Sequence, residues 1–299
     1  MNTGVLRKKL LALLIFPVLP LLAFASPGLS AEGVVISIKG KVTVSAHGAD
    51  SPARAGMRLK PGFKVQSLGG TASLLLDDGK MHSIKEGGSF TVPPGESAGV
   101  KDNMASRLMD TIRETTLRGK GPTIKGMVRG EREIALIYPF NSFITPDELR
   151  FEWEATVGLA DLEISLKSPS PVYQFAFKPG PGENRALFPE KGAPLSPGVR
   201  YYWKVTGFDE AKGETYRSKL AWFTILDPQK TEALKGEINK IEATADLEEG
   251  GKAYLTANLF ISYGLHHRAV RVIEESLARN PENTGMKELL QGVFAKMKK

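Results

Sequence analysis

Apolar and polar residues alternate in short runs between residues 33 and 100, and glycine, proline and aspartate separate these runs. Alternation with a period of two is typical of β-strands with one buried face. Residues 34–38 and 41–44 flank Gly40, which predicts a strand, a turn and a second strand. The pair Gly69-Gly70 predicts the start of another strand. Residues 33–100 are therefore expected to form an all-β domain.

A hairpin is predicted further along the same region. Asp78-Gly79 lies between the apolar run that ends at Leu76 and an alternating run over 80–84. Aspartate and glycine tolerate the left-handed backbone conformation that a tight turn requires. The two runs are therefore expected to pair as antiparallel strands.

The connecting segment, residues 101–128, changes to a helical period. Met104, Leu108, Ile112 and Leu117 fall close to helical spacing, with charged residues between them. One amphipathic helix of about four turns is expected here. We expect its apolar stripe to pack on a flanking β domain, and the alternative is a docking helix for a partner. The basic stretch 118–123 lacks the order of a phosphate-binding loop and reads as a linker.

Residues 129–227 return to strand alternation. One strand places Leu149, Phe151 and Trp153 on a single face, and a later strand does the same with Tyr201 and Trp203. Several short alternating strands separated by turn prolines are typical of a β-sandwich. Both tryptophans are then expected in the core, with stacking against a sugar as the alternative.

The last region, residues 229–299, has a helical period throughout. Leu234, Ile238 and Ile241 share one stripe, and further apolar stripes follow the pair Gly250-Gly251 and the turn at Gly264. The fold class predicted for the whole chain is mostly β with C-terminal α: two all-β domains followed by a helical hairpin region.

The N-terminus differs from the rest of the chain. Three basic residues at 7–9 precede an apolar run over 10–24, which ends in Ala23-Phe24-Ala25. This order is typical of a secretory signal peptide over residues 1–25, and cleavage after Ala31 is the alternative. The apolar run is short and is broken by prolines, so we expect no transmembrane anchor after cleavage. The expected location is the periplasm or the exterior.

Composition excludes several function classes. The chain has 299 residues and no cysteine, which removes disulfides, thiolate nucleophiles and cysteine-ligated zinc. Its formal charge of +7 falls to +4 when the three basic residues of the signal are removed. The remaining basic residues are scattered among acidic ones, so nucleic acid is not an expected partner.

Few side chains suggest chemistry. Asp78, His82 and Ser83 are close together, but a tight hairpin turns such side chains toward solvent rather than into a pocket. A carboxylate pair of Asp77 with Glu86 would be the basis of a hydrolase hypothesis. His266 and His267 are adjacent in sequence and would point about 100° apart on a helix, so they do not form a metal pair. No catalytic, cofactor-binding or metal site is predicted.

The strands of the first domain resemble the FecR-like domain of bacterial envelope proteins. The residues that match its pattern are Gly62, Val65, Gly70, Ala72, Leu74, Leu76, Asp78 and Gly79. The chain departs from this pattern at Phe63, where the family commonly has aspartate. The resemblance implies a compact all-β module of the kind found in sensors and envelope proteins, and it does not imply an enzyme.

Two further resemblances follow. The segment 195–205, L-S-P-G-V-R-Y-Y-W-K-V, resembles the fibronectin type III and immunoglobulin-like superfamily. Within residues 229–299, a helix, a glycine turn and a second helix resemble one divergent tetratricopeptide repeat with flanking helices, with Ala269 at the close helix crossing and Asn280-Pro281 at the end of the unit. Repeats of this kind bind partners in an apolar groove between their helices. The residues predicted to bind a partner are Tyr254, Leu259, Tyr263, His266, Arg268 and Ile273.

The function predicted from these features is that of a non-enzymatic exported envelope protein. It would act as a scaffold or adaptor through contacts with another envelope protein. The alternative is a protein that binds cell-wall or surface polysaccharide through its β domains.

Overall fold

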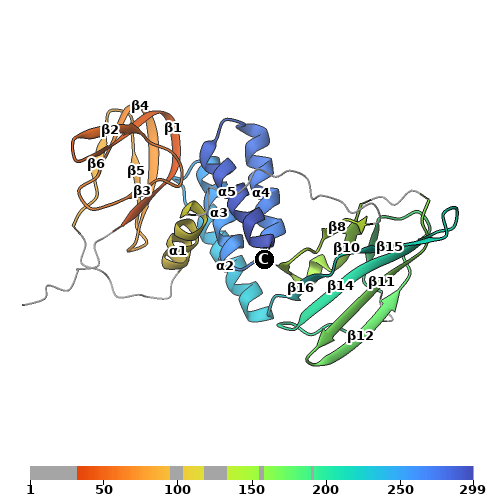
Figure 1. Cartoon of the computed structure of the whole chain (residues 1–299). Helices are drawn as coiled ribbons and strands as arrows, with labels where there is room; N and C mark the ends of the chain where they lie inside the picture. Colours follow the sequence, from red (N-terminus) through yellow and green to blue (C-terminus); the bar gives the residue numbers. More distant parts are fainter. Residues whose placement is uncertain (1–31, 95–103, 118–132, 155–157, 190–191, 299) are drawn as a thin grey trace, which may run out of the picture.

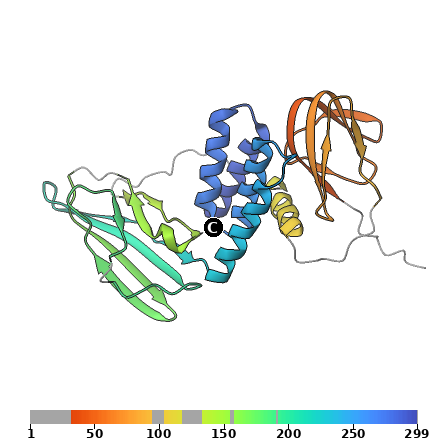
Figure 2. The same cartoon turned by 180° about the vertical axis from the view of Figure 1, so that it is seen from behind.

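The computed structural model describes residues 32–94, 104–117, 133–154, 158–189 and 192–298. The prediction of a mostly β chain with C-terminal helices is confirmed. Two β units lie at opposite ends of the molecule, with the helices between them (Figures 1 and 2). The predicted signal peptide, both of its cleavage sites and the linker at 118–123 lie outside the described residues.

The N-terminal β unit is a sheet of six strands in the order β2-β1-β4-β5, with β3 paired to β1 and β6 paired to β4. Its core contains Val35, Leu59, Val65 and Leu74, each with 0% exposure. The strands are β1 (Gly33–Ala46), β2 (Ala49–Pro52), β3 (Arg58–Leu59), β4 (Lys64–Leu76), β5 (Met81–Ile84) and β6 (Ser89–Thr91).

The turn predicted at Gly40 is wrong, and so is the strand start predicted at Gly69-Gly70. Each glycine lies inside a long continuous strand, β1 or β4, and Gly40 is paired with Gly70. A Cβ atom on Gly70 would lie 1.9 Å from the carbonyl oxygen of Lys39, so the two backbones approach too closely for any side chain. Gly40 also has a φ of +76°, which favours glycine. These glycines bend two paired strands rather than end them.

The hairpin predicted at Asp78-Gly79 is confirmed, because β4 and β5 pair antiparallel across this turn. Gly79 has a φ of +85°. The Asp78 carboxylate accepts a hydrogen bond from the Lys80 N–H at 2.9 Å. The turn chemistry visible in the sequence therefore sets this register.

The middle β unit has two sheets around one core. One sheet runs β13-β10-β8; the other runs β12-β11-β14-β15-β7, with β16 paired to β14 and β9. Phe151 and Trp153 of the first sheet pack with Trp203 and Phe223 of the second, and all four are fully buried. The strands are β7 (Glu133–Ile134), β8 (Leu136–Tyr138), β9 (Ser142–Ile144), β10 (Arg150–Trp153), β11 (Ala160–Pro169), β12 (Val172–Phe177), β13 (Arg185–Leu187), β14 (Arg200–Asp209), β15 (Glu214–Ser218) and β16 (Ala221–Ile225); a 3-10 turn covers Pro146–Glu148.

In the part of the chain that the structure describes, five α-helices form the body between the β units. They are α1 (Met104–Leu117), α2 (Pro228–Glu242), α3 (Glu249–Ser262), α4 (His266–Arg279) and α5 (Thr284–Met297). The helix predicted in the connecting segment is α1. Helix α4 ends before Asn280-Pro281, as expected, and the Asn283 side chain caps α5 by accepting a hydrogen bond from the Met286 N–H.

The pair Gly250-Gly251 was expected before a helix but lies inside the first turn of α3. Gly251 is buried, and a Cβ atom there would lie 2.5 Å from Leu247 and 3.2 Å from the Ser37 side chain. The glycine therefore allows α3 to approach β1 closely, which its turn propensity does not reveal.

Helix α1 packs mainly on other helices, α3 and α5, and not only on a β domain as expected. Ala105, Leu108 and Ile112 are buried in one core with residues of all four C-terminal helices. Val34 and Ile36 of β1 and Leu75 of β4 belong to the same core. The outer face of the N-terminal sheet is thus covered by α1 and α3, and the two parts share one hydrophobic core.

An ion-pair cluster adds to this junction. The Glu32 carboxylate accepts hydrogen bonds from Arg58 at 2.7 Å and from Arg113 of α1 at 2.9 Å. Partial burial alone would raise the pKa of Glu32, but the two guanidinium groups hold it below its ordinary value. None of the helices in the described part of the chain is long and apolar enough to cross a membrane.

Candidate functional site

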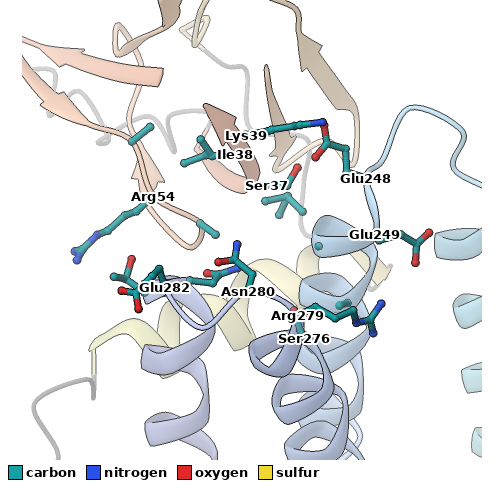
Figure 3. Close-up of a pocket in the computed structure, with 17 residues that line it drawn as sticks. Ser37, Ile38, Lys39, Arg54, Glu248, Glu249, Ser276, Arg279, Asn280 and Glu282 are labelled. Atoms are coloured by element: carbon teal, nitrogen blue, oxygen red, sulfur yellow. The ribbon is translucent and has the colours of Figure 1, made fainter. Parts of the chain in front are cut away.

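A cleft of about 480 Å³ opens between the N-terminal β unit and the helical body (Figure 3). One wall is β1 at residues 36–39 together with residues 53–55, and the opposite wall comes from the first turn of α3. The end of α4 and the start of α5 close the floor. The polar residues that line the cleft are Ser37, Lys39, Arg54, Glu248, Glu249, Ser276, Arg279, Asn280, Glu282, Asn283 and Thr284.

Several charged groups of the cleft are engaged within the protein. Arg54 forms an ion pair with Glu288 of α5 at 2.8 Å, and the Glu248 carboxylate accepts a hydrogen bond from the Thr71 hydroxyl at 3.1 Å. The Arg279 Nε donates to the carbonyl oxygen of Glu275 at 3.2 Å. The first two contacts join the N-terminal β unit to α5 and to the start of α3, and the third lies within α4.

The cleft offers hydroxyl and amide groups that can form hydrogen bonds with a ligand. Ser37 and Ser276 are nearly buried, and Ser276 and Asn280 lie on the side facing Ser37 and Ile38 (Figure 3). An amide such as that of Asn280 both donates and accepts hydrogen bonds, as does a peptide group.

The residues predicted to bind a partner do not form one exposed groove. Tyr254, Leu259 and Ile273 have exposures of 3%, 0% and 0%, because the N-terminal β unit, α1 and the neighbouring helices cover them. Their side chains contribute to the shared core and offer no surface to a partner in this arrangement.

The other three predicted residues contact the rest of the chain. The Tyr263 hydroxyl donates to Glu237 at 3.0 Å. His266 Nδ1 lies 3.3 Å from the carbonyl oxygen of Asn141, and Arg268 bonds the Thr145 hydroxyl at 2.8 Å. His266 and Arg268 therefore hold the middle β unit against α4.

This contact, which we call the α4 joint, consists of the start of α4 and residues 138–148. The Phe143 N–H donates to the carbonyl oxygen of Gly264 at 3.0 Å, and the Phe140 N–H donates to His267 Nε2 at 2.9 Å. Arg268 also pairs with Glu148 at 3.0 Å. The joint thus combines these polar contacts with aromatic ones, since Phe140 and Phe143 pack against the helical core and the Tyr138 ring lies against His267.

The candidate catalytic residues of the hairpin do not converge. Asp77 and Glu86 lie beyond opposite ends of β5, and the Asp77 carboxylate instead accepts a hydrogen bond from the Glu32 N–H. The His82 ring packs on Phe90 with a centroid distance of 4.4 Å, and the Ser83 hydroxyl lies 3.5 Å from the carbonyl oxygen of Asp246. These groups do not form a nucleophile with an oriented base.

No group of three or more histidine, aspartate or glutamate side chains within the described ranges could hold a metal ion. His266 and His267 bond backbone groups of the same loop, residues 140–141. Trp153 and Trp203 are fully buried, as expected for core residues, and neither is available to stack on a sugar.

The cleft itself was not foreseen from the sequence. Its walls come from four segments, residues 36–39, 53–55, 248–253 and 276–284, and no pattern in the sequence indicates that these segments meet. The one usable signal was the Gly250-Gly251 pair, which marks the close approach of α3 to β1.

Comparison with protein-family models gives no match for this chain, and comparison with curated proteins gives none either.

Proposed function

We propose that this protein is a non-enzymatic, exported adaptor of the bacterial cell envelope that binds an extended segment of another protein in the cleft. The observation that carries the proposal is the cleft of about 480 Å³, which has walls from two parts of the chain and a lining that combines amide and hydroxyl groups with charged side chains. Its size lies within the range of small-ligand sites, and its chemistry suits backbone amides.

The shared core supports this proposal. Val34, Ile36 and Leu75 of the N-terminal β unit are buried together with the helices, so both walls of the cleft are held in a fixed position. A preformed site loses less conformational entropy on binding. The helical body would thus hold the two β units in place and form one wall of the binding site.

The proposal also covers the family of each part of the chain and the location of the protein in the cell. The N-terminal β unit would be a FecR-like module, the middle β unit would be a fibronectin or immunoglobulin-like domain, and helices α3 and α4 would be one tetratricopeptide-like pair. The predicted signal peptide supports export to the periplasm or the exterior.

The test uses two matched substitutions. A Cβ atom on Gly250, which lines the cleft, meets no atom within 4 Å, and the same is true of exposed Gly236 in α2. Gly250→Trp should fill the cleft without disturbing α3, because glycine is the poorer helix former. Gly236→Trp makes the same change outside the cleft.

Residues 32–299 of each variant serve as bait for cross-linked capture from envelope extract. We expect a defined protein to be recovered by the wild type and by Gly236→Trp, and to be lost with Gly250→Trp. Equal recovery by all three would exclude the cleft as the binding site. Recovery of no protein, or of glycan alone, would exclude the adaptor function.

A further inference from the structure

Strand β12 is an unprotected sheet edge. It pairs with β11 alone, and at six residues it is the longest of the described strands that has a single strand neighbour. An edge strand presents a row of unpaired backbone N–H and C=O groups, which proteins usually protect with charges, prolines or bulges. In Figure 1 the strand lies at the outer margin of the middle β unit, away from the helical body.

None of these protections is present in β12. Its sequence, VYQFAF, has no charged residue and no proline, and its register with β11 is uninterrupted. The shorter edge strand β2 has both Asp50 and Pro52. Val172, at the start of β12, is 90% exposed.

The two faces of β12 differ. Tyr173, Phe175 and Phe177 are half-buried on one face, whereas Val172, Gln174 and Ala176 are exposed on the other. The Phe175 ring lies 5.9 Å from that of Phe177 and 5.5 Å from that of Phe188, which follows β13. Phe175 thus extends an aromatic row to the open edge of the sheet.

We propose that β12 is a self-association surface, on which a second copy of this chain adds its own β12 in antiparallel orientation. Side chains that lie opposite each other across an antiparallel pair point to the same face of the sheet. The alternation of β12 therefore favours a register in which Phe175 faces Phe175 of the copy and Tyr173 faces Phe177. In this register two aromatic rows join into one, and the joined sheets place no like charges opposite each other.

The proposed pairing is expected to be weak because its interface area is small. Two six-residue strands bury less than the roughly 1,200 Å² at the low end of standard interfaces. We therefore expect a monomer that becomes a dimer as concentration rises. Such a dimer would present two copies of the cleft and bind a repeated partner with increased avidity. The self-association itself does not depend on the proposed function of the cleft.

The test uses exposed positions of β12. In the proposed register Gln174 lies opposite Ala176 of the copy. Gln174→Lys with Ala176→Lys places like charges opposite each other twice, and Gln174→Lys with Ala176→Glu places opposite charges there. The two double variants share their positions and differ only in the sign of one charge.

Sedimentation velocity across a range of concentrations measures the mass of each form of the full mature chain. The wild type should shift toward the dimer mass, the Lys/Lys variant should stay monomeric, and the Lys/Glu variant should dimerise at least as strongly as the wild type. Circular dichroism checks that both variants are folded. A wild type that stays monomeric would overturn the proposal, and this is also the result expected if β12 pairs with a different protein. Double variants that behave alike would overturn it as well.

Discussion

The imidazole of His267 is the group of the α4 joint whose protonation most directly affects the structure. Its Nε2 accepts the hydrogen bond of the Phe140 N–H, which only the neutral ring can do. Its ring also lies 4.8 Å from that of Tyr138. Burial lowers the pKa of His267 to about 4, and the positive charges of Arg150 and Arg271 act in the same direction.

We expect this histidine to make folding depend on pH. Because the pKa is lower in the folded protein than its ordinary value near 6.5, the contribution to stability is complete above pH 6.5 and is lost as pH falls toward 4. The loss should reach about 3 kcal/mol in the free energy of unfolding. Urea unfolding at several pH values, followed by tryptophan fluorescence and helical circular dichroism, measures it.

His267→Gln is the appropriate variant for this prediction, since the glutamine side chain can accept a hydrogen bond but does not titrate in this range. Stability of the variant should decline less steeply between pH 6.5 and pH 4 than that of the wild type. The same slope in both proteins would show that other groups set the pH dependence. His266 also has a lowered pKa, caused mainly by burial, and contributes in the same direction.

At the scale of elements, helix α1 joins the N-terminal β unit to the helical body. Leu108 and Ile112 each have 1% exposure and lie in the core shared by β1, β4 and the C-terminal helices. At the far end of α1, Thr115 packs against Gly292 of α5, where a Cβ atom would lie 3.2 Å from the threonine side chain. Helix α1 is therefore packed between the N-terminal β unit and the helical body, and its apolar face is not free to dock a partner.

Ile112→Ala should destabilise the helical body by about 2–4 kcal/mol, because it removes buried methyl groups and leaves a cavity. Asp110→Ala is the control on the same helix, since Asp110 is exposed and forms only a surface ion pair with Arg113. That substitution should change stability by no more than about 0.5 kcal/mol. Urea unfolding followed by helical circular dichroism tests both, and equal effects would contradict the central position of α1.

Local pattern was sufficient for many elements. Several strands, the helix α1 and the Asp78-Gly79 turn could be predicted because periodicity and turn chemistry depend on residues that are close in sequence. Gly40 was misread because a glycine that allows two strands to approach closely resembles a glycine that forms a turn. The partner strand that makes the difference, β4, lies about thirty residues away.

For the whole molecule, the distribution of cores indicates two cooperative parts. The N-terminal β unit has an inner core of its own and, through Val34, Ile36 and Leu75, shares a second core with the helices, whereas the middle β unit has a separate core. The α4 joint contains hydrogen bonds and ion pairs, and Phe140 and Phe143 also pack against the helical core there. A chain that ends at Asp227 would lose α2 to α5 and expose Val34 and Ile36, so it would not report on partner binding alone.

Thermal unfolding should therefore show two separable transitions. All three tryptophans lie in the middle β unit, so their fluorescence reports on that unit, while helical circular dichroism reports on the helical body. Ile36→Ala should lower the helical transition and leave the fluorescence transition in place, although Ile36 lies in a β-strand. Phe223→Ala should do the reverse, and each substitution should cost about 2–5 kcal/mol.

A single transition seen by both probes would contradict this division. It would show that the α4 joint couples the two parts strongly. A shift of the fluorescence transition by Ile36→Ala would lead to the same conclusion.

Spacing between near neighbours is enough to predict a mostly β chain with C-terminal helices, the position of one hairpin turn, and the core positions of Trp153 and Trp203. What covers each apolar face depends instead on contacts between segments that are distant in sequence. The apolar helix face with Tyr254 and Leu259 was predicted to bind a partner, but the N-terminal strands and α1 of the same chain cover it. The cleft is likewise made from segments more than two hundred residues apart, because alternation records that a face is buried and not which surface buries it.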